Sequence, residues 1–207
     1  MSFSGYLSTV SVLEITALPP GLSELFSYTD ARRHGLSDRQ IRRLSEEGAI
    51  ERIGRGLFSR TTLDVDPDLI EVAFRSERAT ICLTSALARH DLTDEIPASI
   101  DLALPRGTRA PATSAPITWH QFDPKTFDLG RADLDVGAGY RIGLYSAERS
   151  ICDAFRLRHL EGSEQAVEAL KRWLRRPGSQ PSRLFALAAE MGPRATEPIR
   201  SALQILL

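Results

Sequence analysis

One short polar segment of the sequence contains the residue types that read and neutralise DNA, namely Arg39, Gln40, Arg42 and Arg43. Arginine can bind guanine through two hydrogen bonds, glutamine can bind adenine in the same way, and neighbouring arginines neutralise phosphates. On a helix, Ile41 and Leu44 share one face and leave the four polar side chains pointing mostly toward solvent. A solvated helical face without function is the alternative interpretation. The pattern favours a recognition helix that lies in the major groove.

The ends of this helix are marked by residues with capping preferences. Ser37 followed by Gln40 forms a capping box, in which the serine hydroxyl accepts from the Gln40 amide and the glutamine side chain bonds to the Ser37 amide. A helix is therefore predicted to start at Asp38. Gly48 can adopt the left-handed conformation that follows a helix end, so the helix is expected to stop there.

The preceding segments predict the rest of a helix-turn-helix. Residues 7–18 have apolar positions close to helical periodicity, which indicates a first helix. Residues 25–27 indicate a short strand. Thr29 is expected to cap a second, shorter helix over residues 31–34, and Gly35 supplies the sharp turn between two crossing helices.

The segment after the predicted recognition helix has the pattern of a β-hairpin. Residues 50–53 and 57–60 are short β-prone runs joined by Gly-Arg-Gly, which places Arg55 at the hairpin tip. The basic helix and this wing together predict DNA binding. Arg32 and Arg33 are candidates for contacts to the DNA backbone, which position a protein without specifying sequence.

The charge distribution supports this location of the DNA-binding surface. The chain of 207 residues has a formal net charge of −1, but residues 30–60 carry eight arginines and five acids, a balance of +3. Residues 61–207 carry 18 basic and 20 acidic groups, a balance of −2. A local positive footprint of this kind suits phosphate binding. Residues 1–62 are therefore predicted to form a winged helix-turn-helix DNA-binding domain.

Residues 63–207 are predicted to form a larger domain with a small mixed sheet and helices. Asp66 followed by Pro67 is typical of a helix start, and Thr84 is expected to cap a second helix that reaches about His90. The other elements expected from periodicity and turn residues are strands at 100–104, 117–122 and 140–145, helices capped by Ser146 and Ser163, a helix after Pro177-Gly178, and a last helix that starts near Thr196 with Pro198 in its first turn. The predicted fold class is α+β, a winged N-terminal domain followed by a larger mixed α/β domain that ends in a helical bundle.

Several motifs of catalysis and cofactor binding are absent from the sequence. The four histidines have no metal-ligand spacing, so no metal is expected. Gly137, Gly139 and Gly143 miss the dinucleotide fingerprint by one residue and are interpreted as a loop. No phosphate-binding glycine loop and no nucleophile elbow occurs, so no cofactor is expected and a hydrolase is disfavoured.

The two cysteines, Cys82 and Cys152, lie among apolar neighbours, and we interpret both as buried thiols in a reducing compartment. No apolar stretch approaches the roughly 20 residues that cross a bilayer, and the N-terminus lacks the pattern of a signal peptide. A cytoplasmic protein without a membrane partner is expected.

One polar cluster in the second domain has two interpretations. Glu148, Arg149 and Asp153 follow a predicted strand and begin a predicted helix. In the first interpretation, Glu148 favours the positive end of the helix dipole and Arg149 pairs with Asp153 one turn later. In the second, the three residues are candidate catalytic groups of a phosphotransferase. The sequence pattern assigns no catalytic residue, and a protein that is not an enzyme is the first expectation.

The sequence from about residue 25 to residue 174 resembles the AbiEi family of antitoxins, the DNA-binding members of abortive-infection toxin-antitoxin operons. In the N-terminal domain the resemblance rests on the runs Gly35-Leu36-Ser37, Ile41-Arg42-Arg43-Leu44 and Arg55-Gly56-Leu57-Phe58. In the second domain it rests on Ser85-Ala86-Leu87-Ala88, on residues 102–107 and on residues 146–153. The last run is similar to a Glu-Arg-Thr-x-x-Asp pattern of the family, with Ser150 where threonine is usual.

This resemblance implies a function and two partners. The winged domain is expected to bind inverted repeats in the double-stranded DNA of its own promoter and to repress the operon. The second domain is expected to counteract a cognate nucleotidyltransferase-like toxin. Two copies are expected on an inverted repeat, as a homodimer or as cooperative monomers. A direct complex, a covalent modification such as phosphorylation of the toxin, and competition are all open as routes to neutralisation.

Overall fold

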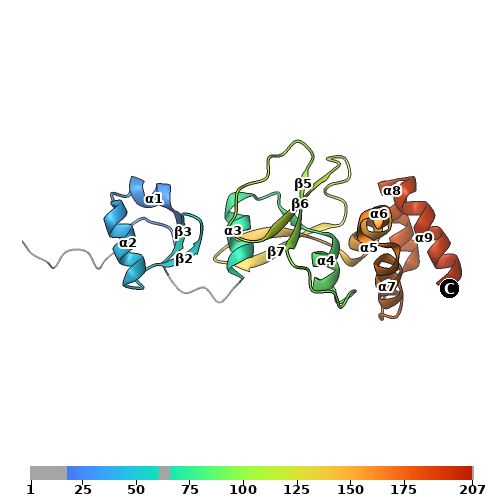
Figure 1. Cartoon of the computed structure of the whole chain (residues 1–207). Coiled ribbons are helices and arrows are strands. Elements are labelled where there is room, and N and C mark those ends of the chain that lie inside the picture. Colours follow the sequence, from blue (N-terminus) through green and yellow to red (C-terminus); the bar gives the residue numbers. More distant parts are fainter. Residues whose placement is uncertain (1–17, 61–65, 207) are drawn as a thin grey trace, which may run out of the picture. The chain divides into compact units, whose positions relative to one another are not determined.

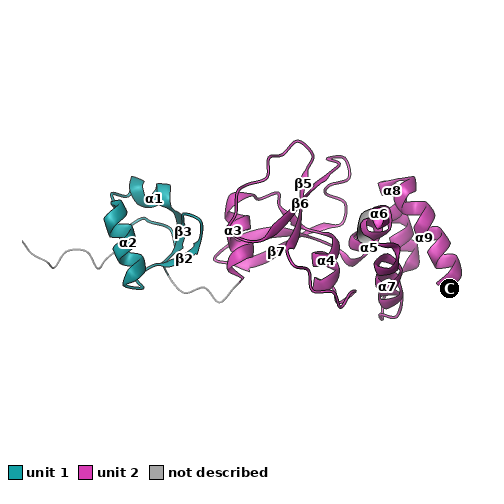
Figure 2. Cartoon of the chain, viewed as in Figure 1, with its two compact units in different colours: residues 1–63 teal, residues 64–207 magenta. Residues whose placement is uncertain are grey.

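The computed structural model describes residues 18–60 and 66–206, except for the side chains of residues 160 and 161. The chain divides into two compact units, residues 1–63 and residues 64–207 (Figure 2). Each unit has its own helices, sheet and hydrophobic core, which confirms the predicted α+β fold class. The helix expected over residues 7–18 lies, except for its last residue, outside the described residues.

In its described residues, 18–60, the first unit contains two helices packed with a three-stranded antiparallel sheet (Figure 1). Its elements are, in chain order, β1 (Leu25–Ser27), α1 (Tyr28–Arg33), α2 (Asp38–Glu46), β2 (Glu51–Gly54) and β3 (Leu57–Ser59). The strand order is β1-β3-β2, so the short strand expected at residues 25–27 pairs with the second strand of the hairpin. The hairpin itself forms as the sequence predicts.

Serine residues set the start of both described helices in the first unit. Ser37 caps α2 in the predicted capping box, and Gly48, with φ +71°, follows the end of the helix as expected. The expected cap at Thr29 is wrong, because Ser27 caps α1 in a second capping box with Asp30. Ser27 is also the last residue of β1 and is extended, so the chain passes directly from strand to helix and leaves Thr29 in the first turn.

One apolar cluster holds the elements of the first unit together. Ile41 and Leu44 project from α2 into the same core as Phe26 of β1 and Phe58 of β3. The two phenylalanine rings stack with their centroids 5.8 Å apart. Full burial of a side chain of this size contributes about 1.5–3 kcal/mol. This core therefore fixes which face of α2 turns inward and which faces solvent.

The second unit contains a mixed five-stranded sheet with strand order β6-β5-β4-β8-β7. The strands are β4 (Thr80–Ile81), β5 (Ile100–Pro105), β6 (Ile117–Phe122), β7 (Arg131–Gly137) and β8 (Tyr140–Tyr145). The β5-β6 and β4-β8 pairs are parallel, and the other two pairs are antiparallel. The three strands expected from the sequence are confirmed. The sequence pattern does not indicate β4, which has two residues, or β7, an edge strand whose acidic residues obscure its apolar alternation.

The sequence pattern suggested that the glycine run at residues 137–143 is a loop, but only part of the run lies in one. Only Gly139, with φ +77°, lies in the turn between β7 and β8, whereas Gly143 lies inside β8. An added Cβ at Gly143 would be 2.4 Å from Thr80 Oγ1 and 2.5 Å from Arg131 Nε. Gly143 therefore leaves the space in which the Arg131 side chain lies beside the strand.

Helices lie against the sheet and continue beyond it as a bundle (Figure 1). Near the sheet, α3 (Pro67–Arg75) packs against β7 and β8, and α4 (Leu83–Arg89) packs against β5. The later helices are α5 (Ala147–Arg156), α6 (Arg158–Glu161), α7 (Ser163–Leu174), α8 (Pro181–Met191) and α9 (Pro193–Leu206). The central helix of the bundle is α5, because α4, α7, α8 and α9 all contact it.

Two of the expected helix caps in the second unit are wrong. α4 begins at Leu83 directly after Cys82, and Thr84 lies inside its first turn. The Thr84 hydroxyl instead accepts a hydrogen bond from Gln165 of α7 at 3.1 Å. α7 begins at Ser163 itself, without a side-chain cap. In both cases the polar residue is part of the helix and does not precede it.

The last helix starts earlier than predicted. α9 begins at Pro193, and Pro198 lies inside it and not in its first turn. Thr196 does not cap the helix, because its hydroxyl donates to the carbonyl oxygens of Ala188 at 2.8 Å and Gly192 at 3.0 Å. Proline is favoured at a first helical position. Both Pro193 and Pro198 could mark the first turn of the last helix, and the sequence pattern alone does not distinguish between them.

Both cysteines are buried thiols, as predicted. Cys82 precedes α4 and Cys152 lies within α5. Burial, and to a smaller extent the neighbouring Asp153 carboxylate, raises the pKa of the Cys152 thiol to about 12. Among the described residues, no helix has both the length and the apolar composition needed to cross a membrane.

We expect neither thiol to react with Ellman's reagent at about pH 8 while the protein is folded, because the thiolate is the reactive form and both residues have no exposed surface. Both thiols should react after unfolding in guanidinium chloride. The released thionitrobenzoate absorbance measures this directly, and rapid reaction of the native protein would contradict the tight packing around α4 and α5.

Candidate nucleic-acid interface

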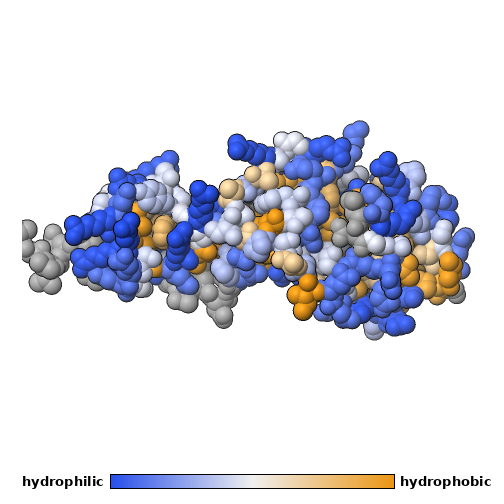
Figure 3. Space-filling view, viewed as in Figure 1, coloured by the Kyte–Doolittle hydropathy of each residue, from blue (hydrophilic) through white to orange (hydrophobic). Residues whose placement is uncertain are grey.

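Helix α2 presents a basic face on the side opposite to the core of the first unit. Ile41 and Leu44 are 4% and 1% exposed, so the helical repeat places Arg39, Arg42 and Arg43 on the outer side. All three arginines are exposed. The surface over α2 in the view of Figure 3 is predominantly hydrophilic. The structure thus brings three of the predicted DNA-binding residues onto one helix face.

The three arginines of this face differ in their partners. The side chains of Arg39 and Arg42 form no hydrogen bond or ion pair with the residues that the structure describes. Arg43 donates from Nε to Glu47 Oε1 at 2.6 Å, one turn later on the same surface. An exposed pair of this kind contributes little to stability. Arg43 can therefore exchange its carboxylate partner for a phosphate at small cost.

Gln40 is committed to the helix cap. Its side-chain oxygen accepts from the Ser37 N–H at 2.7 Å and from the Ser37 hydroxyl at 2.7 Å. Bidentate binding of adenine needs both the oxygen and the nitrogen of the side-chain amide. Gln40 would have to give up the capping box in order to read a base, so its position favours a structural contribution to the interface.

Arg32 and Arg33 lie at the end of α1 and are exposed. Arg32 donates to the Leu36 carbonyl at 3.1 Å and lies 3.1 Å from the Asp38 carboxylate, so it bridges the turn between the two helices. Arg33 pairs more loosely with Asp30, at 3.5 Å. Both arginines therefore stabilise the local geometry and still expose guanidinium groups to solvent.

The wing places Arg55 at the exposed tip of the β2-β3 hairpin, as predicted. Gly56 follows it with φ +65°, a conformation that favours glycine. The Gly56 carbonyl accepts from the Tyr28 N–H at 2.7 Å, which ties the wing to the start of α1. The hairpin tip is thus held in a defined position relative to α2 within the same unit.

A groove of about 480 Å³ lies between α2 and the wing and is lined in part by Tyr28, Arg42, Arg52 and Phe58. Arg52 is exposed and faces this groove, although the sequence interpretation did not include it among the DNA contacts. Its Nε donates to the Gly54 carbonyl at 3.2 Å. Its place in β2, the first strand of the predicted wing, is a signal that sequence reasoning can use. Arg42 and Arg52 give the groove two cationic side chains from different elements.

In the second unit, Arg149 and Asp153 form a fully buried ion pair. Both side chains are 0% exposed, and Arg149 Nε donates to Asp153 Oδ2 at 2.8 Å. Arg149 Nη1 also donates to the carbonyl oxygens of Thr126 at 2.6 Å and Leu129 at 2.7 Å. The second Asp153 oxygen accepts from Arg156 at 2.7 Å. This arrangement favours the interpretation of an intrahelical pair over that of a catalytic cluster.

Aromatic rings complete the surroundings of the Arg149 guanidinium. Its central carbon lies 4.3 Å from the centroid of Tyr145 and 5.7 Å from that of Phe122. Nη2 is buried and has no hydrogen-bond partner among the described residues, and attraction to the ring faces compensates part of that loss. Gly130 is required here, because a Cβ on it would be 2.7 Å from Arg149 Cβ.

The third candidate of this cluster, Glu148, is partly buried in the first turn of α5, where a negative charge suits the helix dipole. Glu148 is therefore partly exposed to solvent, whereas Arg149 and Asp153 are fully buried. Within the described parts of the chain, no group of three histidine, cysteine or acidic residues is arranged to hold a metal ion.

The helix pair, the exposed basic face of α2 and the hairpin beside it define a winged helix-turn-helix, the class predicted for the first unit. Residues 22–61 match the family described as "Transcriptional regulator, AbiEi antitoxin". The AbiEi resemblance that the sequence motifs indicate is thereby confirmed in this part of the chain.

The crystal structure of the RV2827C protein from Mycobacterium tuberculosis is similar over 87% of this chain and 75% of that chain, with a TM-score of 0.47 and 18% sequence identity. A search of functionally curated proteins gives no match.

Replacing Ser37 by Ala should weaken α2, because the Gln40 amide and side chain lose their cap partner. A lost serine cap costs about 1 kcal/mol, which corresponds to roughly fivefold faster hydrogen exchange of the α2 amides. Ser23→Ala, a change of an exposed serine in the same unit, serves as the control. Equal exchange in the two variants would contradict a stabilising capping box.

Replacing Asp153 by Leu should destabilise the second unit by about 3–5 kcal/mol, because it leaves the Arg149 charge buried and unpaired. The double variant Arg149→Met/Asp153→Leu removes both charges and should be more stable than the single variant. Urea unfolding monitored by Trp fluorescence measures both. A single variant as stable as the unmodified protein would show that the buried pair is not required.

Proposed function

We propose that the first unit binds double-stranded DNA and that the chain is an antitoxin that represses its own operon. The observation that carries the proposal is the exposed, unpaired state of Arg39 and Arg42 on the face of α2 that the core leaves outside. The match of residues 22–61 to a family of antitoxin transcriptional regulators supports the regulatory part. Winged domains place such a helix in the major groove.

Within this interface the basic residues have different tasks. Arg39 and Arg42 are the base-reading candidates, because neither must give up a partner to bind guanine. Arg43 and the wing residue Arg55 neutralise phosphates beside the groove. Arg32 and Arg33 of α1 position the backbone. Gln40 contributes by holding the first turn of α2 and not by reading a base.

The proposed operator is an inverted repeat in the promoter, bound by two copies of the chain. Helix-turn-helix proteins read such repeats with one recognition helix in each half-site. The two copies act as a homodimer on DNA or as cooperative monomers. Sedimentation of the protein with one half-site and with the full repeat distinguishes these cases.

The second unit is the proposed antitoxin module, directed against a nucleotidyltransferase-like toxin. It has a hydrophobic core separate from that of the DNA-binding unit, which is what a second, independent activity requires. A phosphotransferase at the start of α5 receives little support, because Arg149 and Asp153 have no exposed atoms with which to meet a substrate. Intact-mass measurement of the toxin after incubation with this protein and ATP tests that alternative.

Binding to a promoter fragment should weaken steeply as salt increases, since each neutralised phosphate contributes about −0.9 to the slope of log affinity against log salt. Arg42→Ala should lose about 1–3 kcal/mol of binding free energy, because it removes one base contact. Arg183→Ala, which changes an exposed arginine of α8, is the matched control. Fluorescence anisotropy measures all three proteins.

Two results would contradict the proposal. A slope near zero would exclude phosphate-mediated binding. Equal losses in Arg42→Ala and Arg183→Ala would place the DNA away from α2.

A further inference from the structure

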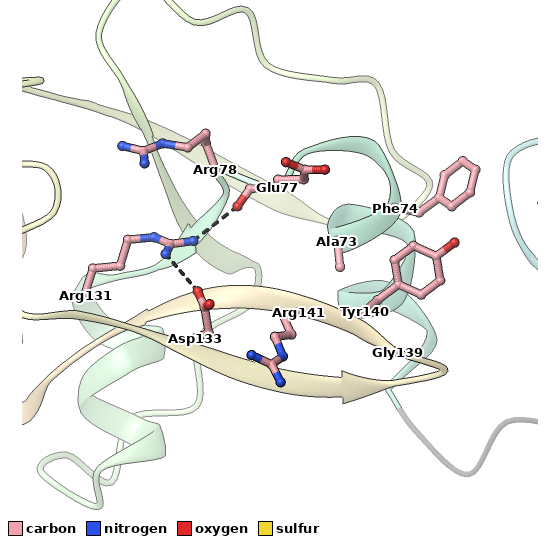
Figure 4. A pocket seen from close by; sticks show the side chains of 9 residues that line it. All are labelled: Ala73, Phe74, Glu77, Arg78, Arg131, Asp133, Gly139, Tyr140 and Arg141. Carbon is pink, nitrogen blue, oxygen red and sulfur yellow. Dashed lines mark hydrogen bonds and ion pairs between the residues drawn. The ribbon is translucent and has the colours of Figure 1, made fainter.

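A second hollow of the molecule, of about 510 Å³, lies on the second unit between α3 and the hairpin of β7 and β8. We call it the α3/β8 pocket. Its volume falls within the range of roughly 300–1,000 Å³ typical of small-molecule sites. In Figure 4 the rings of Phe74 and Tyr140 stand at one end of the lining, the side chains of Arg78 and Arg131 stand at the other, and Arg141, which follows Tyr140 on β8, lies between them. The pocket therefore combines aromatic side chains with charged groups.

The aromatic wall consists of Phe74 from α3 and Tyr140 from β8. Their ring centroids are 5.8 Å apart and the rings are tilted by 50°. Both residues are partly exposed at the pocket. Aromatic faces in such a position stack against planar groups of a ligand, including nucleobases of any sequence.

At the other end, Arg131 is held in one orientation by three hydrogen bonds. Nε donates to Thr80 Oγ1 at 3.0 Å, Nη1 to Asp133 Oδ1 at 2.9 Å, and Nη2 to the Glu77 carbonyl at 3.2 Å. The absence of a side chain at Gly143 makes this placement possible. Each terminal nitrogen carries a second N–H. Arg131 is thus a preorganised hydrogen-bond donor in the lining of the pocket, and 15% of its side-chain surface is exposed.

The remaining charges of the pocket are mixed. The exposed side chain of Arg141 has no hydrogen bond or ion pair with the described residues, whereas the Arg78 guanidinium pairs with the Asp128 carboxylate at 3.0 Å. The carboxylates of Glu77 and Asp133 lie in the same lining. A bare inorganic anion gains little from this balance of charges. A ligand with both hydroxyl donors and a phosphate suits it, because carboxylates accept from hydroxyls and arginines bind phosphate.

We propose that the α3/β8 pocket binds a free nucleoside phosphate. The base stacks on the ring of Tyr140 and packs against the tilted ring of Phe74, the sugar hydroxyls donate to Glu77, and the phosphate accepts from Arg141 and Arg131. Guanidinium groups here take the place of the glycine-rich phosphate loop that the sequence lacks. This site lies within the second unit and does not depend on DNA binding by the first.

Isothermal titration of the full chain with AMP, ATP, adenosine and pyrophosphate tests the assignment. AMP or ATP should bind, and adenosine and pyrophosphate should bind at least tenfold more weakly, because each lacks one half of the ligand. Arg141→Ala should reduce nucleotide affinity at least tenfold, and Tyr140→Ala should reduce the affinity for AMP and adenosine alike. Arg183→Ala should leave all affinities unchanged.

Circular dichroism confirms that each variant is folded, and Arg141→Gln repeats the test with a polar side chain of similar length. Absence of heat with every nucleotide would overturn the proposal. Pyrophosphate binding as tight as ATP binding would also overturn the proposal, because the aromatic residues would then contribute nothing to the affinity. Binding of an unrelated DNA duplex that depends on Arg141, without binding of AMP or ATP, would assign the pocket to a nucleic-acid backbone instead.

Discussion

The buried Arg149 guanidinium is the interaction on which the second unit depends. The Arg149 side chain projects from helix α5 and donates to Asp153 on the same helix. It cannot exchange this partner for water, because the side chain has no exposed surface. Through the carbonyls of residues 126 and 129 and the ring of Tyr145 it joins the loop before β7 and the strand β8 to the bundle behind them. An interior charge is costly when it loses its partners, so a change in how β8 and the loop before β7 meet α5 would destabilise the unit.

Arginine performs opposite tasks in the two units. In the first, the core takes only Ile41 and Leu44 from α2, and the cations of that helix remain in water, where a polyanion can reach them. In the second, Arg131 is surrounded by polar partners and keeps a small exposed fraction at the edge of a pocket. The number of arginines in each segment of the sequence correctly indicates the exposed basic face of α2. It does not distinguish an interior arginine from a pocket arginine, because that difference arises from tertiary packing.

The sequence predicts best those features that need only neighbouring residues. Ser37, Ser146 and the Asp66-Pro67 pair mark helix starts correctly, because each cap bonds within its own first turn. The caps expected at Thr29 and Thr84 fail because the true starts depend on the strand that ends just before them. β4, the groove position of Arg52 and the α3/β8 pocket require partners distant in the chain. Periodicity and spacing carry no information on those contacts.

The Gln40 side chain holds the start of α2, and this limits which positions of the helix can change during evolution. A side chain that holds the first turn cannot be replaced freely without loosening the helix that carries it. Positions 39 and 42 have no such duty among the described contacts. Under the proposed DNA-binding function, new operator preferences can therefore arise by exchange at these two positions while the helix start stays constant. Paralogous copies in one cell would then avoid each other's promoters through a change of two side chains on an unchanged scaffold.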